Sequence, residues 1–106
     1  MKGTAKSKYI RMSPRKIGLV LDQIRGKSAD EAFVLLDFIN KRAVSPVRKT
    51  LKSAVANAAA LDKPESVKIV KAWVGQGPRL KRLKPRAMGR ADILMKPTAH
   101  IQIEVE

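Results

Sequence analysis

The length, composition and charge of the chain limit what it can be. Its 106 residues, 44% of them hydrophobic, allow one small domain, and the lack of cysteine excludes disulfides and cysteine-ligated zinc, as is common in the cytosol. No apolar run approaches the roughly 18 residues of a membrane span, and the basic N-terminus lacks the apolar region of a secretory signal. The formal net charge of +14 therefore predicts a polyanionic partner, with nucleic acid favoured over a membrane surface.

Residues 3–11 are predicted to form a short strand. Lys6 and Lys8 fall on one face together with Ile10, and the odd-numbered residues from 5 to 9 fall on the other. Two interpretations remain open. The lysines either protect an exposed sheet edge or lie on the phosphates of a nucleic acid.

A helix is predicted over residues 14–25, because the serine-proline pair at 13–14 is typical of a helix start and Gly26 of a helix end. Its apolar residues recur at helical spacing: Ile17, Val20, Leu21 and Ile24. Arg15 and Lys16 occupy the first turn, where cations oppose the helix dipole. This placement favours an anionic partner near that end of the helix.

A second helix is predicted over residues 29–39, with Ser28 and Glu31 forming a capping box. We expect its inward residues to be Ala32, Leu35, Leu36 and Ile39, with Phe33 and Phe38 broadening the apolar stripe. Its acidic residues are Asp30, Glu31 and Asp37. This side of the molecule is the least suited to contact a polyanion.

A third helix is predicted over roughly 42–61, with a start on either side of the cap-like pair at 45–46. One face is apolar and consists of Ala43, Val47, Leu51, Ala54, Val55 and Ala58. The opposite side carries Arg48, Lys49 and Lys52. The alanine-rich end permits close approach of another element.

Two strands are predicted in the second half, one over 66–74, after a turn at 62–64, and one over 99–106. The second strand alternates clearly, with Ile101, Ile103 and Val105 on one face and His100, Gln102, Glu104 and Glu106 on the other. A strongly basic segment separates the two strands.

The basic segment, residues 75–97, holds seven cations against one acid, Asp92, for a net charge of +6. The cations are Arg79, Lys81, Arg82, Lys84, Arg86, Arg90 and Lys96. It has three prolines, three glycines and no aromatic residue, so it cannot bury a face of its own. We expect it to be ordered mainly against a polyanion.

Two strands flanking this segment predict a long β-hairpin, with the turn near 85–90, where Gly89 can take positive φ. Residues 75 to 88 would span roughly 40 Å if extended. A domain of this size has a radius of gyration of only about 13 Å, so the arm must project. We predict one domain, 1–106, with a body of 1–74 and 98–106 and an arm of 75–97.

No catalytic or cofactor-binding pattern is present. His100 is the only histidine and lies on the polar face of the last strand, where it is expected to be a surface or hydrogen-bonding residue. There is no glycine-rich phosphate loop and no metal-binding spacing. Trp73 and Tyr9 are too few for a base-stacking platform. We expect no enzyme activity, cofactor, metal or small-molecule substrate, and recognition through phosphates, shape and arm insertion.

An ordered series of motifs resembles the bacterial-type family of ribosomal protein twenty-two of the large subunit, almost end to end. The motifs are Gly77-Pro78, Lys81-Arg82, Pro85-Arg86-Ala87-x-Gly89-Arg90-Ala91 and Thr98-x-His100-Ile101, together with Ser13-Pro14-Arg15-Lys16, Ile24-Arg25-Gly26-Lys27 and Ser53-Ala54-x-Ala56-Asn57-Ala58. The series as a whole is far more specific than any one of them.

The resemblance implies an α+β fold: three helices packed on a three-stranded antiparallel sheet, with a long β-hairpin projecting from the body. It implies a structural protein of the large (50S) ribosomal subunit, in the cytoplasm or an organelle, that binds 23S rRNA and supports subunit assembly. Its other expected partners are neighbouring large-subunit proteins and the nascent peptide, because the hairpin tip of this family lines the peptide exit tunnel.

The implied tunnel tip is Arg86, Ala87, Met88, Gly89 and Arg90. The rRNA-binding set that we predict comprises Lys6, Lys8, Arg11, Ser13, Arg15, Lys16, Arg25, Lys27, Arg79, Lys81, Arg82, Lys84, Arg86, Arg90, Lys96, Thr98 and His100. Within it, Lys81, Arg82 and Lys84 would line the arm.

The main alternative is a DNA-bending architectural protein, since some of these also use basic β-arms that carry proline. Such proteins need a dimer and an apolar wedge at the tip, for which Met88 is the only candidate. An RNA-processing enzyme would need an acid–base pair that the sequence lacks. A membrane-active peptide would need an apolar face that the basic segment lacks.

Overall fold

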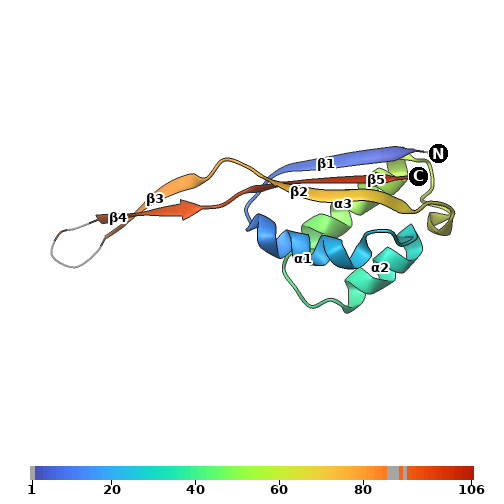
Figure 1. Cartoon of the computed structure of the whole chain (residues 1–106), viewed down its shortest axis with the longest axis horizontal. Coiled ribbons are helices and arrows are strands. Elements are labelled where there is room, and N and C mark those ends of the chain that lie inside the picture. The colour runs from blue at the N-terminus through green and yellow to red at the C-terminus, as the bar shows by residue number, and fades with distance from the viewer. Residues whose placement is uncertain (1, 86–88, 90) are drawn as a thin grey trace.

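A body of helices and sheet lies at one end of the molecule, and a two-stranded ribbon extends from it (Figure 1). The computed structural model describes residues 2–85, 89 and 91–106, with the backbone alone for 82–85 and 91–95. The molecule measures 61 × 24 × 18 Å, so it is more than twice as long as it is wide. No helix in these ranges is long and apolar enough to cross a membrane.

The body contains a three-stranded antiparallel sheet, as predicted, and its strand order is β1-β5-β2. The strands are β1 (Gly3–Ile10), β2 (Ile69–Gln76) and β5 (Ala99–Val105). β5 lies in the centre, and its inward residues are buried as its alternation predicted: Ile101, Ile103 and Val105. The predicted start of β2 was wrong, because Pro64–Ser66 forms a short 3-10 turn, η1, and the strand begins three residues later.

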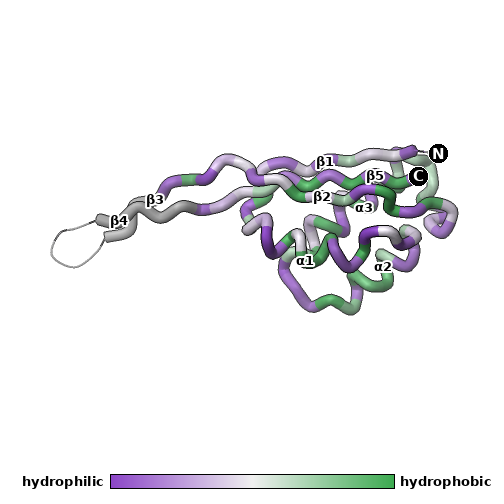
Figure 2. Tube along the Cα trace, viewed as in Figure 1, coloured by the Kyte–Doolittle hydropathy of each residue, from purple (hydrophilic) through white to green (hydrophobic). Residues whose placement is uncertain are grey.

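Three helices cover one face of this sheet (Figure 1). They are α1 (Pro14–Ile24), α2 (Ala29–Phe38) and α3 (Val44–Asn57). The core is drawn from the expected faces of α1 and α3: Ile17, Val20, Leu21, Ile24, Ala43, Val47, Leu51, Ala54, Val55 and Ala58 are all buried. Hydrophobic residues gather in the body, and hydrophilic residues prevail where the ribbon leaves it (Figure 2).

The edge strand β1 lies unusually close to α3. A Cβ at Gly3 would collide with the carbonyl oxygen of Ala54 and with Ala58, so only glycine fits there. Farther along, the Asn57 amide donates to the Thr4 carbonyl oxygen at 2.7 Å. The alanine-rich end of the third helix does permit close approach, as expected. That helix stops at Asn57 rather than 61, because the chain turns away just beyond it, with Ala59 at φ 55°.

Three predictions for α2 were wrong. The capping box does not form, because the Ser28 hydroxyl donates to Oδ1 of Asp30 at 2.6 Å and makes no bond to the helix N–H groups. Phe38 does not broaden the buried stripe but is 83% exposed at the last position of the helix. Leu35 and Ile39 are half-buried rather than fully inward, while Ala29 is fully buried instead.

The predicted alternation of β1 fails at its end. Tyr9 has φ 59°, and the register with β5 shifts between Ser7 and Ile10. This bulge leaves the Tyr9 side chain 65% exposed, while Ile10 packs against the core. A bulge places one extra residue in a strand without requiring a particular residue type, so the alternating sequence pattern did not reveal the bulge at Tyr9.

The ribbon consists of β3 (Leu80–Pro85) and β4 (Ala91–Lys96), paired antiparallel from Leu80 opposite Lys96 to Pro85 opposite Ala91. This confirms the projecting hairpin. Gly89 has φ +74°, as its place in the turn predicted. Arg86, Ala87, Met88 and Arg90, the remainder of the predicted tip, lie outside the described residues.

The ribbon continues directly from β2 and β5 through a short pinned root. The Gly77 N–H donates to the Thr98 carbonyl oxygen at 2.9 Å, and the Thr98 hydroxyl donates to the Pro78 carbonyl oxygen at 2.5 Å. A Cβ at Gly77 would collide with the Thr98 hydroxyl, so the two chains meet too closely for a side chain. These contacts fix the position at which the ribbon leaves the sheet.

Candidate nucleic-acid interface

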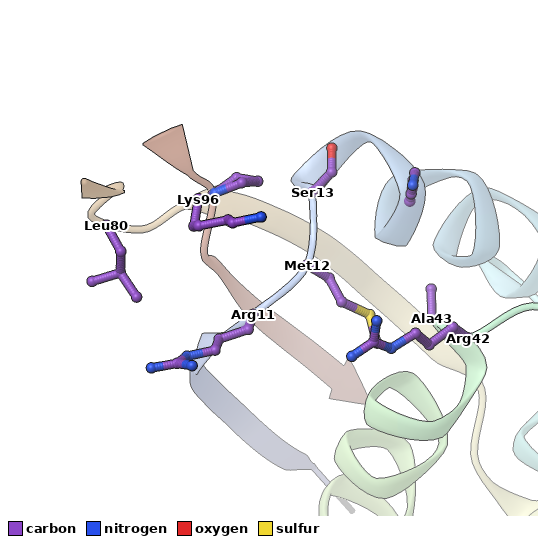
Figure 3. A pocket seen from close by; sticks show the side chains of 9 residues that line it. Arg11, Met12, Ser13, Arg42, Ala43, Leu80 and Lys96 are labelled. Atoms are coloured by element: carbon purple, nitrogen blue, oxygen red, sulfur yellow. The ribbon is translucent and has the colours of Figure 1, made fainter. Parts of the chain in front are cut away.

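A cavity of about 550 Å³ lies where the ribbon meets the body (Figure 3). We call it the junction cavity. Its lining comes from four segments: the residues between β1 and α1, the first turn of α1, the start of α3 and the root of the ribbon. The lining residues are Arg11, Met12, Ser13, Lys16, Arg42, Ala43, Leu80, Lys96 and Pro97.

The polar part of the junction cavity is cationic. Arg11, Lys16, Arg42 and Lys96 line it, and no carboxylate among the described side chains does. Within the described part of the chain, neither recorded ion pair involves any of these four side chains. Four like charges without neutralising partners create a local positive potential, which favours an anion.

Two helix N-termini add to this potential. Ser13 is the N-cap of α1 and Ala43 is the N-cap of α3, and both line the cavity. Neither helix has an acidic residue in its first turn, and the Ser13 hydroxyl makes no capping bond. Pro14 and Pro46 have no N–H, and the N–H groups of Lys16 and Val44 already donate to the carbonyl oxygens of Ser13 and Lys41. The positive end of each helix dipole is therefore the feature that favours an anion, such as a phosphate.

The remaining wall of the cavity is apolar. Met12 packs against the core, and Ala43, Leu80 and Pro97 complete the surface. The volume falls within the range of about 300 to 1,000 Å³ that small-molecule sites occupy. A cavity of this size with cationic and apolar sides suits a phosphate together with its attached sugar.

Four of the predicted RNA-binding residues, Arg11, Ser13, Lys16 and Lys96, meet in this cavity although they are up to 85 positions apart in the chain. Arg15 is exposed in the same first turn of α1. Sequence reasoning missed Arg42. Its only local signal was its position just before a helix whose start was uncertain, and its proximity to Arg11 arises from the tertiary fold.

Other predicted residues lie elsewhere. Lys6, Lys8 and His100 line the open face of the sheet, opposite the helices. Lys27 lies beyond the far end of α1 and lines a shallow hollow with Asp30 and Glu31. The predicted set is thus divided between the junction, the open sheet face, the far end of α1 and the ribbon.

Arg25 and Thr98, both in the predicted set, make hydrogen bonds within the protein, as His100 also does. The Arg25 guanidinium donates from Nε and Nη2 to the Ala72 carbonyl oxygen, at 3.0 and 2.6 Å, and from Nη1 to Asp22 at 2.5 Å. Thr98 is only 4% exposed and holds the root of the ribbon. These contacts within the protein are sufficient to explain why position 25 is arginine and position 98 is threonine.

The ribbon carries the remaining cations. Arg79 and Lys81 are exposed, and the backbones of Arg82 and Lys84 lie in β3. Arg86 and Arg90 fall outside the described residues. A strand in which basic residues recur therefore leads outward from the junction cavity.

Three of the nine acidic residues, Asp30, Glu31 and Asp37, lie on α2, on the side of the body away from the ribbon (Figure 1). Hydrogen bonding from the Ser28 hydroxyl lowers the pKa of Asp30. Asp37 forms an ion pair with Arg48 of α3. Among the described residues, no three potential metal ligands come together. The charge of the molecule is thus polarised, with its cationic end at the junction and the ribbon.

Comparison with known proteins gives a consistent result along the chain. A family model described as ribosomal protein L22p/L17e matches residues 5–106. Proteins named large ribosomal subunit protein uL22 are similar: that of Acaryochloris marina is 57% identical over 95% of this chain and 86% of its own length. That of Fusobacterium nucleatum is 52% identical over 99% of this chain and 96% of its own length. A protein of Phaeodactylum tricornutum, named large ribosomal subunit protein uL22c, is 50% identical over 94% of this chain and 89% of its own length.

Proposed function

The chain belongs to the ribosomal protein L22p/L17e family, and on this premise we propose that it binds 23S rRNA as a structural constituent of the large ribosomal subunit. The junction cavity is the observation that carries the rRNA proposal, because four cations from distant segments meet there without a carboxylate from the described side chains. The family is one of structural ribosomal proteins rather than enzymes, and we propose that the protein acts in a ribosome of the cytoplasm or of an organelle.

Phosphate contacts supply the binding in this proposal. An rRNA strand laid across the junction would place phosphates on Arg11, Lys16 and Arg42, and continue along the basic strand β3. Each neutralised phosphate releases counterions, which favours association at physiological salt. The pinned root between Gly77 and Thr98 orients the ribbon toward the RNA before contact is made.

The ribbon requires a surrounding structure to support it. An isolated two-stranded ribbon is marginally stable in water, and the net charge of +6 on residues 75–97 adds repulsion. Insertion between rRNA segments would neutralise this charge and shield both edges. We propose that assembly orders the ribbon and that the ribbon in turn joins separate parts of the rRNA.

The hairpin tip, residues 86–90, would then border the passage of the nascent peptide. The length of the ribbon supports this, since it carries the turn far from the body, and two paired strands are narrow. A photo-crosslinker at position 88 in translating ribosomes should label nascent chain or tunnel rRNA. Labelling of surface proteins alone would contradict this placement.

Neighbouring large-subunit proteins would contact the opposite side of the body. On α2, Val34 is 55% and Phe38 83% exposed, beside the acidic residues that repel RNA. Exposed apolar side chains with a polar rim are characteristic of protein contacts. This arrangement separates an RNA side from a protein side.

The rRNA proposal is tested by the salt dependence of binding to a 23S rRNA transcript. If about six cations engage phosphates, log K should fall with log salt with a slope of about −4 on single strands and about −5 on duplex-like RNA. A slope near −1 would contradict it. A stable dimer of the free protein would instead favour the DNA-bending alternative, which needs two arms.

A further inference from the structure

The face of the sheet opposite the helices carries a row of side chains across all three strands. Lys6 of β1 pairs with Gln102 of β5, which pairs with Trp73 of β2. Residues directly opposite on neighbouring strands share a face, so these three side chains lie side by side. Trp73 is 41% exposed, which is unusual for the only tryptophan of a small domain with a modest core.

A depression of about 200 Å³ lies on this face next to Trp73. The lining residues that matter here are Lys6, Lys8, Trp73, Gly75, His100 and Gln102. Gly75 is opposite His100 in the register, and it follows Trp73 by two residues on the same face. The missing side chain of Gly75 therefore leaves the space between the indole and the imidazole unfilled.

No contact among the residues that the structure describes accounts for glycine at position 75. A Cβ there would meet no atom within 4 Å, and the residue does not take positive φ. Glycine within a strand carries an entropic cost, and one use of it is to let a ligand approach the backbone closely. Gly3 and Gly77 differ in this respect, because close packing explains both.

His100 is held in a defined state beside this space. The backbone N–H of Tyr9 donates to Nδ1 of His100 at 3.1 Å, and the two rings meet edge to face with centroids 5.1 Å apart. Because Nδ1 accepts, the neutral ring carries its hydrogen on Nε2. The Nε2–H lies toward Gly77 and remains a donor that no recorded hydrogen bond among the described residues uses.

The charges around the depression favour an anion. Lys6 and Lys8 line it, and none of the carboxylates that the structure describes does. Glu104, on the same face of β5, lies in the next row, between Thr4 and Lys71, farther from the ribbon. An aromatic surface beside two lysines is the combination that binds unpaired nucleotides by stacking and phosphate contact.

We propose that this depression holds one unpaired base of the rRNA, stacked on Trp73 above Gly75. This rests on the proposed function, and it adds a base-binding site to the phosphate contacts at the junction. The flanking phosphates lie on Lys6 and Lys8, and His100 Nε2–H donates to the nucleotide. Two residues along a strand span about 6.6 Å, which leaves room for one base and not for a stacked pair.

Sequence reasoning had counted two aromatic residues and judged them too few for a stacking platform. The fold alters this judgement in two ways. It adds the ring of His100, oriented by Tyr9, and it places Gly75 where a side chain would otherwise cover the indole. One base on one tryptophan needs no extended platform.

Trp73 itself reports on the site, because it is the only tryptophan. We would titrate the full-length protein with a 23S rRNA transcript, with a single-stranded RNA hexamer and with a blunt RNA duplex, and record its emission. The transcript and the hexamer should quench Trp73, and the duplex should not. Trp73→Ala should weaken transcript binding by about 5- to 150-fold, the range of one lost base stack, whereas Trp73→Phe should stay near wild type.

Gly75→Val gives the sharpest comparison, because valine fits the open space and suits a strand, so the fold should be unaffected. It should abolish quenching and weaken transcript binding at least fivefold. The matched control Thr4→Val, on the same face and one row beyond, should bind as wild type.

The outcomes separate the two proposals. The base site alone would be overturned if the wild-type protein binds the transcript with the expected salt dependence but its Trp73 emission does not change. The same would follow if the transcript affinity of Gly75→Val is within twofold of wild type. Quenching by the duplex as strong as by the hexamer would also overturn it. Failure of the wild-type protein to bind the transcript would overturn both proposals.

Discussion

The backbone N–H of Tyr9 donates a hydrogen bond to Nδ1 of His100, joining the bulged end of β1 to the central strand β5. The residues are 91 positions apart in the chain. A non-glycine residue with positive φ is uncommon and costs of order 1 kcal/mol, so the contact with His100 helps to offset the bulge. The same bond orients the imidazole beside the root of the ribbon.

Removing this acceptor should destabilise the free protein. His100→Ala leaves the Tyr9 N–H without its partner, and we expect the free energy of unfolding in urea to fall by about 1 kcal/mol. His100→Asn, which keeps an acceptor near the Nδ1 position, should recover part of the loss. Equal stability of the alanine variant and the wild type would show that the bond contributes nothing.

The close approach of β1 to α3 predicts a contrast between two glycines. Gly3→Ala forces a Cβ against the backbone of Ala54 and should destabilise the fold by about 1–3 kcal/mol. Gly75→Ala, also in a strand, meets no atom and should change stability by less than about 0.5 kcal/mol. Urea unfolding of both variants measures the difference, and a tolerated Gly3→Ala would show that the two elements can separate freely.

The Ser28–Asp30 hydrogen bond predicts a small dependence on acid pH. It lowers the pKa of Asp30 below its ordinary value of 3.8, so the unfolded state binds the proton more tightly. The contribution to stability is complete above the ordinary pKa and is lost as pH falls through the folded pKa. Ser28→Ala should raise the pKa of Asp30 in an NMR titration, whereas Ser45→Ala should leave it unchanged.

Removing one charge from the junction cavity should weaken rRNA binding without changing the stability of the free protein. Arg42→Gln removes one of four like charges that lack recorded ion pairs among the described residues, so the free protein should keep its stability within about 0.5 kcal/mol. The salt slope of rRNA binding should shrink by about 0.7–0.9 for the lost phosphate contact. Lys49→Gln, on the exposed side of α3, is the matched control. An equal loss from the control would show that only total charge matters.

Local patterns in the sequence predicted most of the fold. The spacing of Ile17, Val20, Leu21 and Ile24 defined the buried face of α1, and the alternation of Ile101, Ile103 and Val105 defined the inner face of β5. Each pattern is complete within one element. The errors arose where a neighbouring group decided the outcome, as when Asp30 accepts the Ser28 hydroxyl that the capping box required.

The candidate site was less accessible to sequence reasoning. The net charge identified the kind of partner, and the predicted rRNA-binding set contained Arg11, Lys16 and Lys96. The meeting of these residues with Arg42 depends on how β1, α1, α3 and the ribbon pack together. The space above Gly75 depends likewise on strand register, which places His100 opposite it. Neither the junction cavity nor the space above Gly75 can be recognised from the sequence pattern of any one segment.

Directed cleavage of rRNA tests the orientation of the protein most directly. The chain has no cysteine, so one introduced cysteine can carry an iron chelate to a single position. Leu80→Cys places it at the junction cavity, and Val34→Cys places it on the acidic helix α2. In assembled large subunits, we expect hydroxyl radicals from position 80 to cut 23S rRNA strongly and those from position 34 to cut it weakly. Strong cutting from position 34 with none from position 80 would contradict an RNA interface at the junction and the ribbon.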